Sequence, residues 1–143
     1  MRAPRSLAAI LTGLFFSSCG PSAAPPAIAI GTECARCGME VQDRRFACER
    51  RGREGWRVYD AIECLLADPG FEHAETAWVP DYDQQSLHRA DSLWVVRGEF
   101  ASPMGGGYAA FLARAAADSV ARATRGHVDH LAAFASGRPR GSS

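Results

Sequence analysis

The chain has 143 residues, of which 47% are hydrophobic and 22% are charged. That length is enough for one compact domain with a terminal extension. The hydrophobic fraction is that of a globular protein and is too high for a disordered one. All 16 basic residues are Arg, and 16 acidic residues balance them. The composition therefore gives no support to a nucleic-acid binder, which needs an excess of basic side chains.

The N-terminus has the pattern of an export signal. Arg2 and Arg5 precede an apolar run at residues 7–16, which is too short to span a bilayer core of ~30 Å. The run ends in Phe-Ser-Ser-Cys-Gly at residues 16–20. This ending resembles the lipobox of bacterial lipoproteins, with Phe16 at a position where Leu is usual.

We therefore expect residues 1–18 to be a lipoprotein signal peptide and Cys19 to carry a diacylglycerol. A glycine directly after the lipidated cysteine, as Gly20 is here, resembles the pattern that sorts lipoproteins to the outer membrane. We therefore expect a cell-envelope lipoprotein that is anchored in the outer membrane and faces the periplasm. The alternative is an ordinary signal peptide cut near Ser18, which would leave Cys19 as an unmodified thiol.

The rest of the chain divides into three parts. Residues 19–31 contain three prolines, which favour an extended tether between the anchor and the fold. Residues 32–136 are expected to form one small folded domain. Residues 137–143 lack an apolar anchor and are expected to be a disordered tail.

The first half of the domain shows strand, strand, helix and strand patterns. Asp60 followed by Glu63 has the spacing of a capping box, and Pro69-Gly70 ends the expected helix. The expected elements are strands within 41–51 and at 56–59, a helix at 61–66 and a strand at 76–79.

The second half repeats this order without sequence identity to the first. Its expected elements are a strand at 92–97, a returning strand or helix start at 108–112, a helix at 114–125, and a last strand or short helix at 127–134. Two tandem β-β-α-β units predict an α+β fold with small antiparallel sheets.

The residues of the domain that could bind a metal or react are its cysteines and methionines. Cys34 and Cys37 form a CxxC motif, which Gly38 and Met39 follow directly. Besides Met1 and Met39, the chain has one more methionine, Met104, in a Gly-rich segment. Methionines that fill a core sit among apolar helical residues, and these two do not. Thiolates and thioethers are soft ligands suited to Cu(I), whereas Ca²⁺ and Mg²⁺ prefer oxygen. A soft-metal site is therefore one interpretation.

Other interpretations of the CxxC motif stay open from spacing alone: a redox dithiol, part of a zinc site, or a small disulfide in an oxidising compartment. A zinc ribbon needs a second ligand pair, and His127 with His130 is the one close candidate. We expect Cys48 and Cys64 to be buried structural thiols, with a disulfide between them as the alternative. The sequence contains no phosphate loop, HExxH motif or nucleophile elbow.

Five segments, in their order and spacing, resemble the NosL family of lipoprotein copper chaperones, which are associated with nitrous oxide reductase maturation. They are ECARCGM at 33–39, YDAIECL at 59–65, VPDY at 79–82, WVVRG at 94–98 and SPMGGGYAAF at 102–111. The resemblance covers residues 33–126.

The resemblance implies a periplasmic Cu(I) carrier that is not an enzyme. It would take Cu(I) from an upstream donor and deliver it by ligand exchange to a copper enzyme, nitrous oxide reductase. It also implies that Cys34 or Cys37, Met39 and Met104 bear the metal. A CxxC thiol–disulfide oxidoreductase and a structural lipoprotein with a disulfide are the alternative functions.

Overall fold

A computed structural model of the chain describes residues 24–71 and 76–135. The predicted signal peptide, the predicted lipidation site Cys19 and the predicted tail at 137–143 lie outside the described residues. Within the part that is described, no helix is long and apolar enough to cross a membrane.

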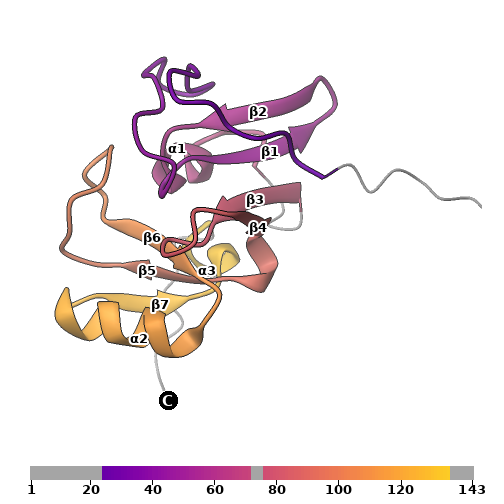
Figure 1. Ribbon diagram of the computed structural model, residues 1–143. Coiled ribbons are helices and arrows are strands. Elements are labelled where there is room, and N and C mark those ends of the chain that lie inside the picture. Colours follow the sequence, from indigo (N-terminus) through magenta and orange to yellow (C-terminus); the bar gives the residue numbers. More distant parts are fainter. Residues whose placement is uncertain (1–23, 72–75, 136–143) are drawn as a thin grey trace, which may run out of the picture.

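The elements follow the predicted order in both halves (Figure 1). The first half contains β1 (Cys48–Gly52), β2 (Gly55–Tyr59), α1 (Ile62–Leu66), β3 (Ala77–Pro80) and β4 (Leu87–Arg89). After a 3-10 turn at Ala90–Ser92, the second half contains β5 (Trp94–Arg97), β6 (Tyr108–Phe111), α2 (Arg114–Ala123), β7 (His127–Asp129) and α3 (Leu131–Ala135).

Both halves have the same topology. The strand order is β2-β1-β3-β4 in the first sheet and β6-β5-β7 in the second, with every pair antiparallel. In each unit the first strand is central, the hairpin partner lies on one side, and the strand after the helix lies on the other. The predicted α+β fold of tandem β-β-α-β units is therefore confirmed, with β4 as an addition that the sequence patterns did not indicate.

Three local predictions differ from the structure. The first strand begins at Cys48 rather than near residue 41, because Asp43 accepts the backbone N–H of Arg45 at 2.9 Å and holds a turn there. The capping box was wrong: Ala61 is the N-cap of α1, and no side chain caps it. The ambiguous segment at 127–134 contains both predicted elements, β7 followed by α3.

The two halves share one hydrophobic core. A single cluster of buried side chains draws on β1, β2, α1 and β3 and also on β5, β6 and α3. Its members include Cys48, Tyr59, Ile62, Leu65, Val79, Leu93, Val95, Ala110 and Leu131. Because both sheets contribute to this core, the position of α1 relative to the second half is fixed by apolar burial.

A buried polar network fixes the C-terminal end of α1 on the first sheet. Asp68 lies just after the helix, and its carboxylate accepts hydrogen bonds from Tyr59 and, at 3.1 Å, from Arg50. Arg50 Nε also donates to the Tyr59 hydroxyl at 3.0 Å. Burial alone would raise the pKa of Asp68, but the hydrogen bonds from Tyr59, from the Gly70 N–H and from Arg50 lower it to about 2.

The N-terminal segment covers the other face of the first sheet. Ile28 packs there with Val41 and Ala47, so the packed part of the chain begins inside the segment predicted as a tether. Glu49 lies on this face by strand alternation. It is fully buried, neither of its carboxylate oxygens has a hydrogen-bond partner, and burial raises its pKa to about 7.

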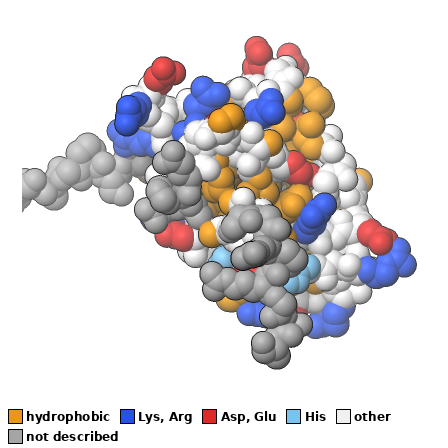
Figure 2. Space-filling view, turned by 180° about the vertical axis from the view of Figure 1, so that it is seen from behind, with side chains coloured by type: hydrophobic (Ala, Val, Ile, Leu, Met, Phe, Trp, Pro, Cys, Tyr) orange, Lys and Arg blue, Asp and Glu red, His pale blue; other side chains and the backbone are white. Residues whose placement is uncertain are grey.

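Some large hydrophobic side chains remain at the surface. Figure 2 shows apolar side chains gathered near the middle of one face, with Arg and acidic side chains around its edge. The most exposed among the described residues are Ile30, Met39, Met104 and Leu112. The two predicted methionine ligands are therefore accessible to solvent and to a partner.

Candidate metal site

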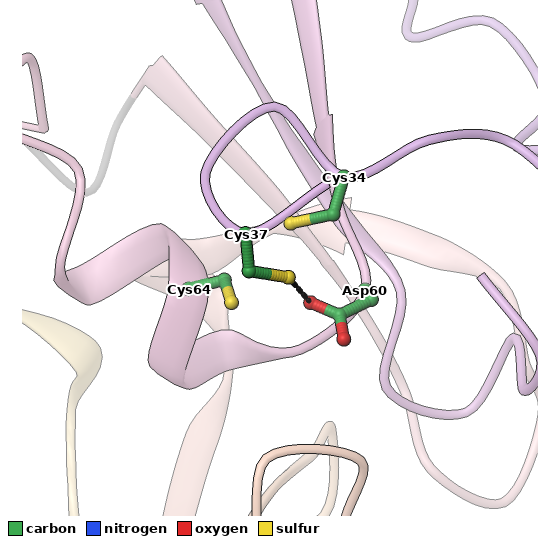
Figure 3. A group of neighbouring side chains, drawn as sticks. All are labelled: Cys34, Cys37, Asp60 and Cys64. Carbon is green, nitrogen blue, oxygen red and sulfur yellow. Dashed lines mark hydrogen bonds between the residues drawn. The ribbon is translucent and has the colours of Figure 1, made fainter. Parts of the chain in front are cut away.

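Four side chains that can ligate a metal converge beside α1. They are Cys34, Cys37, Asp60 and Cys64, and their ligand atoms all lie within 4.8 Å of one another. Figure 3 shows the three sulfur atoms and the carboxylate facing a common centre. The CxxC loop supplies two thiols, the residue after β2 supplies the carboxylate, and α1 supplies the third thiol.

The CxxC loop is a tight turn rather than a loose segment. The Cys34 N–H donates to the Met39 carbonyl at 2.8 Å, and the Gly38 N–H donates to the Cys34 carbonyl at 3.0 Å. Gly38 has φ +76°, a left-handed conformation that favours glycine. The Ala35 N–H donates to the Val58 carbonyl at 2.8 Å and ties the loop to β2. These bonds hold both cysteines in place without a metal.

Helix α1 brings Asp60 and Cys64 to the same side. The helix begins at Ile62, and Ile62 and Leu65 are fully buried, which fixes its rotation about its axis. Asp60 lies just after β2 and two residues before the helix, and Cys64 lies in the helix within 4.8 Å of it, measured between their ligand atoms. Cys64 is 3% exposed and Asp60 is 2% exposed.

The Asp60 carboxylate orients the cluster. The Cys37 thiol donates to Asp60 Oδ1 at 3.7 Å, drawn as the dashed line in Figure 3. Asp60 Oδ2 is buried and has no hydrogen-bond partner. A buried polar atom without a partner is costly. Asp60 therefore has one free acceptor on the buried side of the cluster.

The pKa values of two thiols of the cluster, Cys37 and Cys64, are raised in the metal-free protein. Loss of hydration raises the pKa of Cys37, and the Cys34 thiol and the Asp60 carboxylate act in the same direction. Burial also raises the pKa of Cys64, with hydrogen bonding to Asp60 as the next cause. A metal ion that binds as a thiolate complex must displace these protons.

The Met104 loop is held against α1 by Glu63, the neighbour of Cys64 in sequence. Glu63 Oε1 accepts the Ser102 hydroxyl at 2.8 Å and the Gly106 N–H at 3.0 Å. A Cβ atom at Gly106 would lie 2.6 Å from Glu63 Cγ, so only glycine permits this approach. Figure 1 shows the loop between β5 and β6 extending toward α1.

The structure brings together some of the predicted site residues. Cys34 and Cys37 meet in the cluster. Met39 follows in the same turn, and Met104 stands on the Glu63-anchored loop, with side chains that are 48% and 42% exposed. The role of both methionines as ligands stays a prediction.

Sequence reasoning missed two members of the cluster. Cys64 was expected to be a structural thiol, and Asp60 was expected to be a helix cap. No local signal marks either residue as a ligand, because Asp60 has the spacing of a helix cap and Cys64 lies among apolar helix residues. Their meeting with the CxxC loop depends on tertiary packing.

The other sulfur and imidazole candidates lie outside the cluster. Cys48 is buried, and its thiol donates to the Ala61 carbonyl at 3.5 Å. All four cysteines in the described ranges are free thiols, so the alternative Cys48–Cys64 disulfide is not formed. His130 Nδ1 lies 3.0 Å from the Leu93 carbonyl. None of the histidines at described positions belongs to the cluster.

Comparison with solved structures finds the crystal structure of the copper chaperone NosL from Shewanella denitrificans. The two structures align with a TM-score of 0.65 and 20% sequence identity, over 77% of this chain and 94% of that chain. The fold is that of NosL. No family sequence model and no curated protein sequence matches the chain. The resemblance to NosL is therefore confirmed at the level of the fold.

The NosL-like fold and the cluster chemistry fit copper binding. Three thiols form a soft donor set of the kind that selects Cu(I) and other thiophilic ions. A single hard carboxylate among them does not suit Ca²⁺ or Mg²⁺, which need several oxygen ligands.

Proposed function

We propose that the protein is a Cu(I) chaperone of the cell envelope. It is anchored as a lipoprotein through Cys19 at the outer membrane, faces the periplasm, and carries copper from an upstream donor to a copper enzyme, nitrous oxide reductase. The observation that supports the proposal most is the convergence of Cys34, Cys37 and Cys64 within a NosL-like fold. The protein has no catalytic step of its own, because its task is to hold and pass on the ion.

The proposed copper ligands are Cys34, Cys37, Met39 and Met104. A thioether binds Cu(I) without losing a proton, and a thiolate adds negative charge and affinity. The two cysteines are held by the hydrogen bonds of their turn. Met39 closes the same turn as the cysteines, and the Met104 loop is fixed to α1 through Glu63.

Transfer follows from the exposure of these ligands. Cys37, Met39 and Met104 are exposed, so an incoming thiolate, imidazole or thioether of the acceptor can reach the ion. The acceptor ligand binds as one of the chaperone ligands leaves. Copper then passes from the chaperone to the acceptor without being released into solution.

The test is an anaerobic Cu(I) titration of the reduced protein against a competing Cu(I) chelator, with a Met39→Leu/Met104→Leu double variant beside the wild type. We expect tight one-to-one binding, weakened about tenfold or more in the double variant. The conservative exchange Leu112→Ile, at an exposed apolar residue on neither loop, is the matched control and should leave the affinity unchanged. Binding that is indifferent to both methionines would remove them from the site.

A CxxC thiol–disulfide oxidoreductase is less well supported. Such enzymes use a thiol whose pKa is lowered, which increases the thiolate fraction that attacks a disulfide. Here the pKa of Cys37 is raised by loss of hydration and by its acidic neighbour. A dithiol exchange activity that does not depend on Met39 and Met104 would favour the oxidoreductase over the chaperone.

A further inference from the structure

We propose that copper alternates between two sulfur sets that share Cys37. The inner set is Cys34, Cys37 and Cys64, and it retains the ion. The outer set is Cys37, Met39 and Met104, and it presents the ion to an acceptor. This inference rests on the proposed function and adds Cys64 as a ligand together with a direction of transfer.

Burial separates the two sets. Cys34 and Cys64 are 2% and 3% exposed, whereas Met39 and Met104 are 48% and 42% exposed. Cys37 is exposed as a residue, yet its sulfur points inward to Asp60 (Figure 3). Cys37 is therefore the one ligand that can contact copper on both sides.

The number of donors also favours alternation. With the two proposed methionine ligands, the three clustered thiols make five sulfur donors, which is more than a single low-coordinate Cu(I) ion takes. The three thiols are already within 4.8 Å of one another, so the inner set is assembled before copper arrives. Preassembled ligands bind more tightly because less conformational entropy is lost on binding.

Cys64 differs from Cys48, which is also buried and belongs to the same hydrophobic core. The Cys48 thiol donates to the Ala61 carbonyl at 3.5 Å. The Cys64 thiol instead faces Cys37 and Asp60. The two cysteines thus offer a matched comparison: both are buried next to α1, and one of them faces the site.

Charged groups around the cluster suit an anionic complex. Three thiolates and one Cu(I) ion carry a net negative charge, which is costly to bury without compensation. Arg57 Nη2 donates to the Ala35 carbonyl at 3.3 Å, and Arg36 Nε donates to the Ala67 carbonyl at 3.2 Å. These bonds place two guanidinium groups beside the CxxC loop, where they offset part of the charge.

Asp60 acts as a positioning residue rather than a ligand. A carboxylate is a hard donor that Cu(I) does not prefer. Its hydrogen bond from Cys37, at 3.7 Å, keeps that thiol turned toward Cys34 and Cys64 in the metal-free protein. The inner orientation of Cys37 is therefore the resting one.

The exchange step is balanced without any change of oxidation state. The bond between copper and Cys37 persists. The copper–Cys64 and copper–Cys34 bonds break as bonds to the Met104 and Met39 thioethers form, and each released thiolate takes up a proton from solvent. Copper stays Cu(I). The acceptor's ligands then displace both thioethers and finally the Cys37 thiolate, which takes up a proton as the ion leaves.

The experiment compares Cu(I) affinity with the rate of transfer to a chromogenic Cu(I) chelator. The purified, reduced full chain is loaded with one equivalent of Cu(I), and the variants are Cys64→Ser, Cys48→Ser and Met39→Leu/Met104→Leu. We expect Cys64→Ser to weaken binding at least about a hundredfold and to speed transfer, with Cys48→Ser within about twofold of the wild type. The methionine variant should transfer more slowly and lose less affinity than Cys64→Ser.

The outcomes separate this inference from the function on which it rests. If the wild type binds Cu(I) and depends on its methionines, but Cys64→Ser behaves like Cys48→Ser in affinity and rate, the two-set account is overturned and the chaperone stands. If the wild type does not bind Cu(I), both are overturned. Circular dichroism of the metal-free variants checks their folding, and Cys64→Ala replaces Cys64→Ser if the serine variant does not fold.

Discussion

The backbone N–H of Gly106 donates to Glu63 Oε1 at 3.0 Å, and this bond joins the two β-β-α-β units beside the thiol cluster. Glu63 belongs to the first unit and is the neighbour of Cys64, while Gly106 lies in the loop of the second unit that carries Met104. One carboxylate of the first unit therefore holds the Met104 loop of the second unit beside the thiol cluster.

Removing this connection should weaken copper binding without removing a ligand. Glu63→Ala deletes the acceptor for Ser102 and Gly106, so the Met104 loop loses its anchor on α1. We expect a Cu(I) affinity about three- to tenfold lower, since each lost hydrogen bond is worth about 1 kcal/mol. Glu63→Gln keeps a carbonyl acceptor and is the matched control. Equal affinities for the Ala and Gln variants in chelator competition would show that the anchor has no role.

The two cysteines of the CxxC motif should be indispensable. Cys34→Ser with Cys37→Ser removes both thiolates of the turn while its backbone hydrogen bonds remain. We expect tight Cu(I) binding to be abolished and the fold to persist, as measured by chelator competition and circular dichroism. Tight binding by the double variant would place the copper site elsewhere in the chain.

The buried Asp68 network should make stability depend on acid pH. Asp68 has a pKa of about 2 in the folded protein, below the ordinary 3.8, so its contribution is complete above about pH 4 and is lost as the pH falls through 2. Asp68→Asn should lower the free energy of unfolding by about 2 kcal/mol at pH 7, and by much less near pH 2. Urea unfolding at both pH values measures this. If Asp68→Asn lowers the free energy of unfolding equally at both pH values, the loss comes from packing and not from the charge of Asp68.

Glu49 should give stability the opposite pH dependence to that from Asp68. Burial raises its pKa from 4.5 to about 7, so the folded protein retains a proton that the unfolded chain releases, and stability falls as the pH rises from about 4.5 through 7. Glu49→Gln should therefore stabilise the protein by about 2–3 kcal/mol at pH 8 and hardly at all at pH 4.5. The same gain at both pH values would contradict the role of the buried charge.

Local patterns were sufficient for most of the fold. Alternating residues and turn signals placed β2, α1, β3, β5 and α2 near their observed positions, and the order alone revealed the repeat. The CxxC pair was visible because its two cysteines are only three residues apart in the sequence. The shared core was not visible, because it depends on how two weakly similar sheets pack together.

The parts of the site that sequence reasoning missed are those made by tertiary contacts. Asp60 and Glu63 have the spacing of a capping box, but in the folded chain Asp60 accepts from Cys37 and Glu63 accepts from Ser102 and Gly106. Both carboxylates therefore accept hydrogen bonds from residues distant in the sequence and not from the N-terminal backbone of α1. Cys64 looked like a core thiol for the same reason, since only the burial of its helix neighbours turns it toward the CxxC loop.

The most direct test of the central claim is copper X-ray absorption spectroscopy of the Cu(I)-loaded, reduced protein. It reports the oxidation state of the ion and whether its neighbours are sulfur or the lighter nitrogen and oxygen. We predict Cu(I) in an all-sulfur environment, without nitrogen or oxygen neighbours, because the proposed ligands are thiols and thioethers. A first shell dominated by nitrogen or oxygen, or copper bound as Cu(II), would contradict a Cu(I) chaperone that works through Cys34, Cys37, Met39 and Met104.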